Sequence, residues 1–152
     1  MCGCSGVGKS TWISKNKLPK SEVISPDEER RALGSVNDQS VSAKAFANCY
    51  AKLKASKAEN VYFDATSLNI KSLNGIVACV PDAEITLVLF DNSANAEFCL
   101  KNVRKDIANK VDRSNTPEEV IRNMSERYKT LTSGNQLKMW ISAHKANVIH
   151  VK

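Results

Sequence analysis

The run Gly-Cys-Ser-Gly-Val-Gly-Lys-Ser at residues 3–10 constrains the fold more than any other stretch of the chain. It fits the P-loop pattern of Gly, four residues, Gly, Lys and then Ser or Thr. The glycines let the backbone curl so that consecutive N–H groups point inward and form an anion-binding nest. A helix expected from about Lys9 to Lys15 adds the positive end of its dipole to the same place. This pattern favours a nucleotide-binding loop over a Gly/Ser-rich turn.

The polar positions of the loop have expected roles. Lys9 supplies a positive charge at the β- and γ-phosphates, and the hydroxyl of Ser10 ligates Mg²⁺. Gly6 is an additional glycine that the minimal pattern does not require. We therefore expect ATP and Mg²⁺ as cofactors, with ATP held by this loop and the first helical turn: Gly3, Ser5, Gly6, Val7, Gly8, Lys9, Ser10 and Thr11.

The strand that normally precedes a P-loop is the main structural question. Only Met1 and Cys2 come before Gly3 in the sequence. Either the chain starts late, with Met1 and Cys2 as the tail of an apolar strand, or another run takes the place of that strand. The first strand is therefore expected to be missing or truncated.

Length and composition indicate a single globular domain over residues 1–152, with 42% apolar and 25% charged residues. No apolar run is long enough to span a bilayer and no secretory leader is recognisable, so we expect a cytoplasmic protein without membrane partners. The five cysteines lack the paired spacing of a zinc site, which favours reduced thiols.

The net charge of +6 favours polyanionic partners. The phosphates of ATP account for part of this preference. Charge alone therefore leaves a nucleic-acid partner and a smaller anionic ligand both open.

Strand and helix patterns alternate along the chain. Apolar runs predict strands, and apolar residues at helical spacing or capping signals predict helices. The expected strands are 21–25, 60–66, 84–91 and 147–151, and the expected helices are 25–33, 40–57, 68–80, 94–107 and 117–131. Ser25 and Thr116 are the expected caps of the helices at 25–33 and 117–131. The expected apolar face of the helix at 40–57 carries Val41, Ala45, Tyr50 and Leu53, with Phe46 beside them. Such alternation indicates an α/β fold with a parallel sheet and right-handed crossovers.

Four chemically useful features fall at or just past expected strand ends: the P-loop, Asp27, Asp64 and Asp91. Ligands of open parallel sheets bind beyond the carboxyl ends of the strands. The convergence of these features predicts one site at that edge of the sheet.

Asp27 and Arg30 follow the strand expected at 21–25, and their spacing puts both on one helical face. The carboxylate is suited to orient an attacking hydroxyl and accept its proton, and the guanidinium to grip a substrate phosphate. The alternative is structural, because acidic residues are common in a first helical turn and Glu28 and Glu29 follow the same preference.

Asp64 ends an apolar strand, as the Mg²⁺-associated acid of P-loop enzymes does. We expect Asp64 to lie near the metal or the acceptor, with Thr66 beside it as a further substrate-binding candidate. The alternative is that Thr66 caps the next helix and Asp64 has only a structural role in a turn.

The segment 99–116 is rich in basic residues and is a candidate lid. In small P-loop kinases a basic helix closes over ATP and supplies an arginine to the transferring phosphoryl group. Arg104 is the first candidate for that role, followed by Lys105 and Arg113 as ATP-binding residues. The alternative is a solvated helix face.

Five stretches, read together and in order, resemble the kinase domain of phage-type polynucleotide 5′-kinases. They are "GCSGVGKSTW", "ISPDEERRAL", "VYFDATSLN", "LVLFDNS…CLKNVRKD" and "TPEEVIRNM". The resemblance spans Gly3 to about Leu131, and more broadly it extends to the small P-loop kinases of the same superfamily. The P-loop is common to many families, whereas the combination of Asp-x-x-Arg with "DATSLN" is more specific.

The resemblance implies a three-layer P-loop sandwich of the adenylate-kinase type with a small helical lid. It implies transfer of the γ-phosphate of ATP to the 5′-hydroxyl of DNA or RNA, and it admits a phage-encoded enzyme that acts in the host cytoplasm. Asp27 corresponds to the general base, and Arg30 to the arginine that contacts the 3′-side phosphate of the substrate. Asp64 corresponds to the acid of the family's "DATNL"-like motif.

The lid departs from the family pattern "RN-x-x-R", because strict spacing from Asn102 places Lys105 where an arginine is expected. A lysine neutralises charge but does not form the forked contact of a guanidinium. Two other functions therefore stay open. One is a small-molecule kinase that acts on a nucleoside or metabolite, and the other is an ATP-binding module without catalysis.

Overall fold

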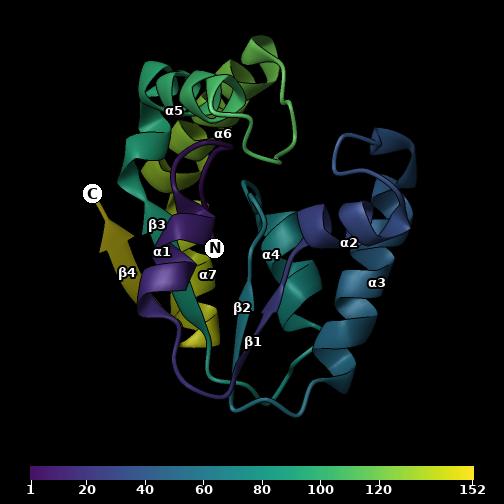
Figure 1. Cartoon of the computed structure of the whole chain (residues 1–152). Helices are drawn as coiled ribbons and strands as arrows, with labels where there is room; N and C mark the ends of the chain where they lie inside the picture. The colour runs from purple at the N-terminus through teal and green to yellow at the C-terminus, as the bar shows by residue number, and fades with distance from the viewer.

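A computed structural model describes all 152 residues of the chain (Figure 1). Its strands are β1 (Ser21–Ile24), β2 (Asn60–Phe63), β3 (Thr86–Phe90) and β4 (Asn147–Val151). Its helices are α1 (Lys9–Asn16), α2 (Pro26–Leu33), α3 (Ser42–Ala55), α4 (Ile70–Val77), α5 (Ala96–Ala108), α6 (Glu118–Ser133) and α7 (Asn135–His144). Two short 3₁₀ helices, η1 (Gln39–Val41) and η2 (Asp91–Ala94), complete the order.

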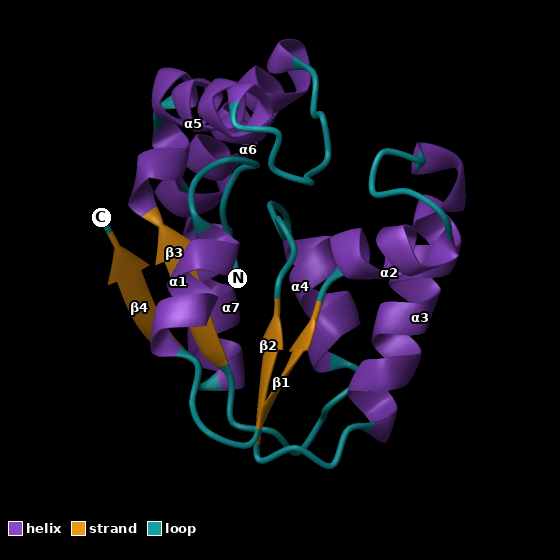
Figure 2. Ribbon diagram, viewed as in Figure 1, coloured by secondary structure: helices purple, strands orange, loops and turns teal.

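The strands form two parallel pairs, β1 with β2 and β3 with β4 (Figure 2). The first residues of the chain lie between these pairs. The amide of Cys2 donates to the carbonyl of Val88 (2.8 Å), and the carbonyl of Cys2 accepts from the amide of Phe90 (3.0 Å). On the other side, the amide of Gly3 donates to the carbonyl of Thr66 (3.1 Å). The chain therefore has the α/β fold with parallel pairing that the sequence predicted.

Cys2 forms a single parallel bridge with Leu89. This geometry agrees with the interpretation of Met1 and Cys2 as the end of a strand position between β2 and β3. Because the P-loop starts at the next residue, it emerges at the carboxyl ends of the flanking strands. That position brings it beside the segments that follow β1, β2 and β3.

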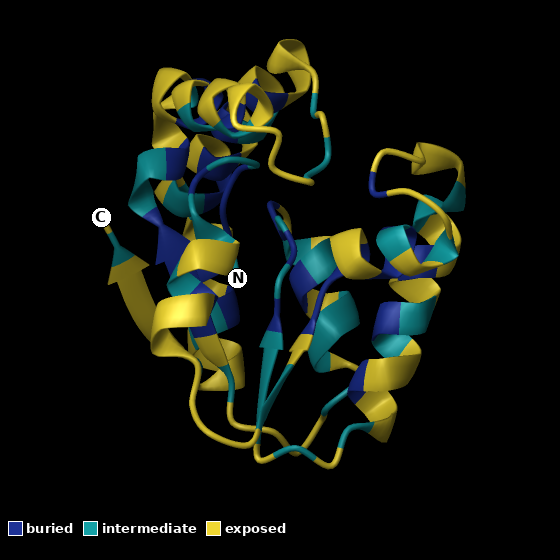
Figure 3. Cartoon of the chain, viewed as in Figure 1, coloured by how far each residue is buried: buried dark blue, intermediate teal, exposed yellow.

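The core is divided among three clusters of buried side chains. Figure 3 colours the buried residues along the backbone dark blue. The largest joins the P-loop to β3, α5 and α6 and includes Cys4, Val7, Phe90, Leu100 and Ile121. A second lies around Leu87, Leu89 and Trp140, and a third around Ile24, Cys49 and Phe63. The nucleotide loop is thus part of the largest core cluster.

Several element ends differ from the sequence predictions. Strand β2 ends at Phe63 and helix α4 begins at Ile70, with the side chain of Asn69 accepting a hydrogen bond from the amide of Ser72 (2.8 Å). Asn69, and not Thr66, is therefore the cap of α4. Ser25 precedes α2 as expected, but its side chain makes no capping hydrogen bond.

Helix α6 begins at Glu118, one residue later than expected, and its N-terminus has no side-chain cap. The expected cap, Thr116, instead places its hydroxyl 3.3 Å from the hydroxyl of Ser5. Thr116 was therefore wrong as a cap, because its side chain is engaged by the P-loop.

Helix α7 was not predicted, although Leu137, Trp140 and Ile141 recur there at helical spacing. Leu137 and Trp140 are buried, and the indole N–H of Trp140 donates to the side chain of Asn74 on α4 (2.8 Å). No helix of the chain has the length and apolar character needed to cross a membrane.

The buried face of α3 runs through Ala45, Cys49 and Leu53. Phe46 and Tyr50 were expected to share the apolar face of this helix. Tyr50 is half-buried and stacks on Phe63, whereas the side chain of Phe46 is 37% exposed. Phe46 therefore belongs to none of the three core clusters.

Candidate functional site

The P-loop curls beneath α5 (Figure 1). The amides of Ser5, Gly6 and Gly8 make no hydrogen bond within the protein. Gly6 has φ +82°, and a Cβ there would lie 2.5 Å from the carbonyl oxygen of Cys99. The additional glycine is thus required by both backbone conformation and contact with α5. A loop with free amides at a helix N-terminus is suited to bind phosphate.

Lys9 lies over its own loop, where its ammonium donates to the carbonyls of Gly3 (3.1 Å) and Cys4 (2.8 Å). Burial lowers the pKa of Lys9, and the nearby carboxylates of Asp64 and Asp27 oppose this effect. The ammonium therefore lies among the residues that sequence analysis assigned to the site. An incoming phosphate offers it a better partner than two neutral carbonyls.

The hydroxyl of Ser10 donates to a carboxylate oxygen of Asp64 at 2.6 Å. This pair joins the first turn of α1 to the end of β2. A hydroxyl and one carboxylate fit Mg²⁺, which prefers oxygen ligands and usually keeps waters and substrate phosphates in its shell. No group of three or more His, Cys, Asp or Glu side chains forms a self-sufficient metal site elsewhere in the chain.

Asp27 and Arg30 form an ion pair on the first turns of α2. The side chain of Arg30 is 10% exposed and also donates to the carbonyl of Val36 (3.2 Å) and the hydroxyl of Ser42 (3.5 Å). The side chain of Asp27 is 51% exposed. A buried, oriented guanidinium thus holds a carboxylate that remains open to a ligand.

The segment after α5 touches the P-loop through Arg113. Its guanidinium donates to the hydroxyl of Ser5 (2.8 Å) and to the carboxylate of Asp106 (2.6 Å), and its side chain is 17% exposed. From α5 itself, the amide of the Asn102 side chain donates to the carbonyl of Gly6 (2.9 Å). These contacts place one cation directly against the phosphate-binding loop.

Arg104 and Lys105 lie differently. Arg104 is 56% exposed and donates to a carboxylate oxygen of Glu118, so its charge is paired at the surface between α5 and α6. Lys105 is exposed and has no ion-pair partner. Of the three lid candidates, Arg113 alone contacts the P-loop in this structure.

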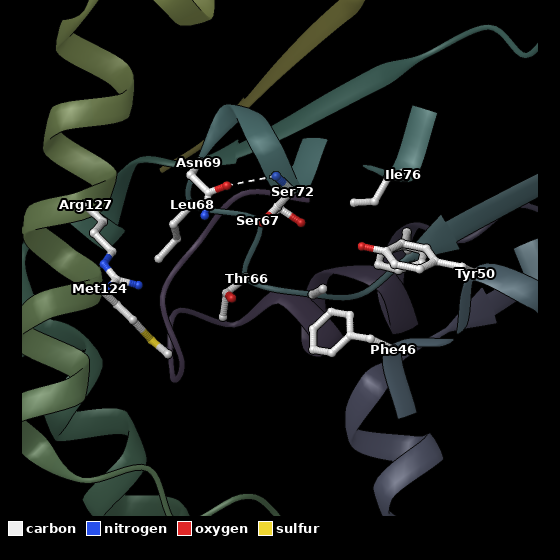
Figure 4. Close-up of a pocket in the computed structure, with 12 residues that line it drawn as sticks. Phe46, Tyr50, Thr66, Ser67, Leu68, Asn69, Ser72, Ile76, Met124 and Arg127 are labelled. Carbon is white, nitrogen blue, oxygen red and sulfur yellow. Dashed lines mark hydrogen bonds between the residues drawn. The ribbon is translucent and has the colours of Figure 1, made fainter. Parts of the chain in front are cut away.

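Thr66 contributes through both its backbone and its side chain. Its carbonyl accepts from Gly3, and its side chain lines a cavity of about 100 Å³ between α3, α4 and α6 (Figure 4). The structure thus brings together the P-loop, Asp64, Thr66 and Arg113, with Asp27 close enough to influence Lys9.

Sequence analysis missed one residue that shapes the loop. Ser93, fully buried in η2, accepts a hydrogen bond at its hydroxyl from the amide of Cys4 (3.0 Å). Cys4 and Ser93 are far apart in the chain, and no sequence pattern around Ser93 predicts their contact. A buried serine in a loop after a strand carries too little signal by itself.

Residues 1–131 match the AAA_33 family, which is described as an AAA domain. The matched segment contains the P-loop, α2, the segment after β2 and the candidate lid. It ends near the end of α6, so α7 and β4 lie outside it. No curated protein matches the chain.

Proposed function

The chain belongs to the AAA_33 family and has a nucleotide-binding, kinase-like P-loop domain, and on this premise we propose that it phosphorylates the 5′-hydroxyl of a DNA or RNA strand with ATP. The observation that carries the proposal is the Asp27–Arg30 pair. A half-exposed carboxylate fixed by a buried guanidinium is suited to an acceptor that presents a hydroxyl beside a phosphate. The 5′ end of a nucleic acid has this chemistry.

On the nucleotide side, the free amides of the P-loop and the ammonium of Lys9 bind the β- and γ-phosphates. Ser10 and Asp64 would hold Mg²⁺, and the ion would supply positive charge to the phosphate oxygens.

On the acceptor side, Asp27 orients the 5′-hydroxyl for in-line attack and accepts its proton. The new bond joins the 5′-oxygen to the γ-phosphorus, and the bond from that phosphorus to the β-bridging oxygen breaks. ADP leaves with that electron pair, and no covalent enzyme intermediate forms. Arg30 binds the phosphate on the 3′ side of the first nucleoside.

Arg113 is the lid residue that we assign to the transferring phosphoryl group. It lies on Ser5 and is held by Asp106, whereas Arg104 is paired with Glu118. A guanidinium there stabilises the charge that develops on the γ-phosphoryl oxygens. The prediction that Arg104 contacts the transferring phosphoryl group is tested by substituting each arginine with alanine.

Two other functions predict different behaviour. A small-molecule kinase on the same scaffold would label free nucleosides or metabolites, and salt would change its acceptor affinity little. An ATP-binding module without catalysis would bind ATP and label no acceptor. The net charge of +6 and the positions of Asp27 and Arg30 favour the strand.

The test incubates the protein with Mg²⁺ and γ-labelled ATP in the presence of matched acceptors. These are an oligonucleotide with a 5′-hydroxyl, the same oligonucleotide with a 5′-phosphate, and a panel of nucleosides. The proposal predicts label on the 5′-hydroxyl strand alone, with transfer falling as salt rises. Label on nucleosides but not on strands, or ATP binding without transfer, would overturn it.

A further inference from the structure

The cavity between α3, α4 and α6 is lined partly by core side chains and partly by Phe46 and Arg127, which belong to no core cluster and have no assigned part in phosphoryl transfer (Figure 4). One wall carries the rings of Phe46 and Tyr50, and the opposite wall carries Met124 and Arg127 from α6. Thr66 lies between these walls. The cavity is therefore apolar on its walls and polar at a few points, as ligand sites are.

Three polar side chains of this cavity, those of Arg127, Tyr50 and Thr66, have no partner within the protein. Arg127 takes part in none of the nine ion pairs of the chain. The hydroxyls of Tyr50 and Thr66 make no hydrogen bond to other protein groups. Burial raises the pKa of Tyr50, so its hydroxyl stays protonated and can donate. An unpaired guanidinium beside an aromatic wall suits a ligand that is both planar and anionic.

Two chain segments, one on α3 and one after β2, link the lining of the cavity to the proposed acceptor site. Arg30 donates to the hydroxyl of Ser42, and Phe46 lies one helical turn further along α3. Thr66 and Ala65, which line the cavity, directly follow Asp64. A strand whose first phosphate lies at Arg30 therefore reaches Phe46 next.

We infer that this cavity binds a nucleobase downstream of the acceptor's 5′ end, stacked on Phe46, with the neighbouring phosphate at Arg127. The inference rests on the proposed function and extends it from a 5′ end to a single-stranded segment. The exposed face of Phe46 serves as the stacking surface. Because every base has a π-face, this surface should bind strands of different sequence.

Phe46 and Arg127 are expected to affect strand binding and not the phosphoryl-transfer step. Phe46 and Arg127 touch neither ATP nor the reacting hydroxyl, so their loss should raise KM for the strand and leave kcat nearly unchanged. Removing one stacked base should weaken strand binding roughly 5- to 150-fold. Removing one phosphate contact should lower the salt slope of single-strand binding by about 0.7.

The chain offers matched controls for both residues. Phe98 on α5 is also a phenylalanine with 37% exposure, and Arg122 lies on α6 but pairs with Glu97. The experiment compares Phe46→Leu with Phe98→Leu, and Arg127→Ala with Arg122→Ala. Leucine keeps most of the apolar packing of Phe46 against Tyr50 while removing the stacking face.

Two readouts are needed: anisotropy of a dye-labelled single strand at several salt concentrations, and transfer kinetics with a 3′-phosphorylated mononucleoside and a longer strand. The inference predicts weaker strand binding for Phe46→Leu and Arg127→Ala, unchanged mononucleotide kinetics, and control variants that behave like the parent. Equal effects in test and control variants, or no effect on long strands, would overturn it. Failure of the parent to label any strand would instead contradict the proposed function.

Discussion

The nucleotide side and the acceptor side of the site hold their functional groups in different ways. On the nucleotide side, Lys9 and Arg113 are engaged by neighbouring groups of the loop and lid, and Gly6 lies against α5. On the acceptor side, Arg30 is fixed while Asp27 and Phe46 remain open to solvent. The groups of the nucleotide side are thus held by contacts within the protein, whereas the proposed acceptor side presents groups that are open to a ligand.

The substitution Asp27→Asn tests the difference between the two sides most strongly. We expect strand phosphorylation to fall by ~10²–10⁴-fold, because the hydroxyl loses its proton acceptor, while ATP affinity stays at the parent value. Single-turnover transfer and ATP titration measure the two effects. The matched control is Glu28→Gln, since Glu28 is a neighbouring acid that pairs with Arg31. Equal losses in the two variants would assign Asp27 a structural role.

The lid provides the next largest contrast. Arg113→Ala should lower kcat by ~10²–10³-fold, because a charged donor at the developing phosphoryl charge is lost. Arg104→Ala should stay within a few-fold of the parent, since its exposed pair with Glu118 is worth little. Steady-state kinetics with a strand acceptor measure both. The reverse order of effects would move the catalytic role to Arg104.

How much of this site the sequence revealed differs between its two sides. The P-loop residues are contiguous, so local spacing predicted Lys9 and Ser10 and also the helix behind them. Asp64 was located because it ends an apolar strand, and its contact with Ser10 follows from the parallel pairing. On the acceptor side, Phe46 was interpreted as core because its helical spacing resembles that of Ala45 and Leu53.

The features that sequence analysis missed depend on contacts between distant residues. Ser93 reaches Cys4, Arg127 reaches the cavity behind Thr66, and α7 packs on α4. None of these contacts changes the local periodicity from which helices and strands are predicted. The lid was ambiguous for the same reason, since several basic side chains share one segment and only the fold selects which of them meets the loop.

A stability measurement sharpens the comparison at two glycines. Gly6→Ala adds a Cβ 2.5 Å from a backbone carbonyl at φ +82°, whereas Gly34→Ala meets nothing within 4 Å at φ +149°. Both carry the cost of an unfavourable φ, about 1–3 kcal/mol. Only Gly6→Ala adds a steric clash, so its melting temperature should drop further and its ATP binding should be lost. Equal melting temperatures would contradict tight packing of the loop against α5.

The smallest expected effect concerns pH. Burial lowers the pKa of Lys9 below its usual value near 10.5. The ammonium therefore loses its proton at a lower pH than usual, and ATP affinity should fall as the pH rises through that lowered pKa. Binding of ATP should restore the charge and take up protons in the same range. Calorimetry in buffers of different ionisation enthalpy measures the uptake, and Lys9→Arg should abolish it because arginine stays charged. Equal uptake in that variant would assign the proton to another group.

Strand binding by the acceptor side is tested most directly by a ratio of two kcat/KM values, measured at fixed Mg²⁺ and ATP. One value is for a 5′-hydroxyl strand and the other is for its free 5′-terminal nucleoside. The strand alone offers phosphates to Arg30 and Arg127 and a base to Phe46. Two such contacts, each worth about 1–3 kcal/mol, predict a ratio of roughly 30 to 2 × 10⁴ in favour of the strand. A ratio near one, or a preference for the nucleoside, would contradict a strand-binding acceptor side and assign the chain to the small-molecule kinases.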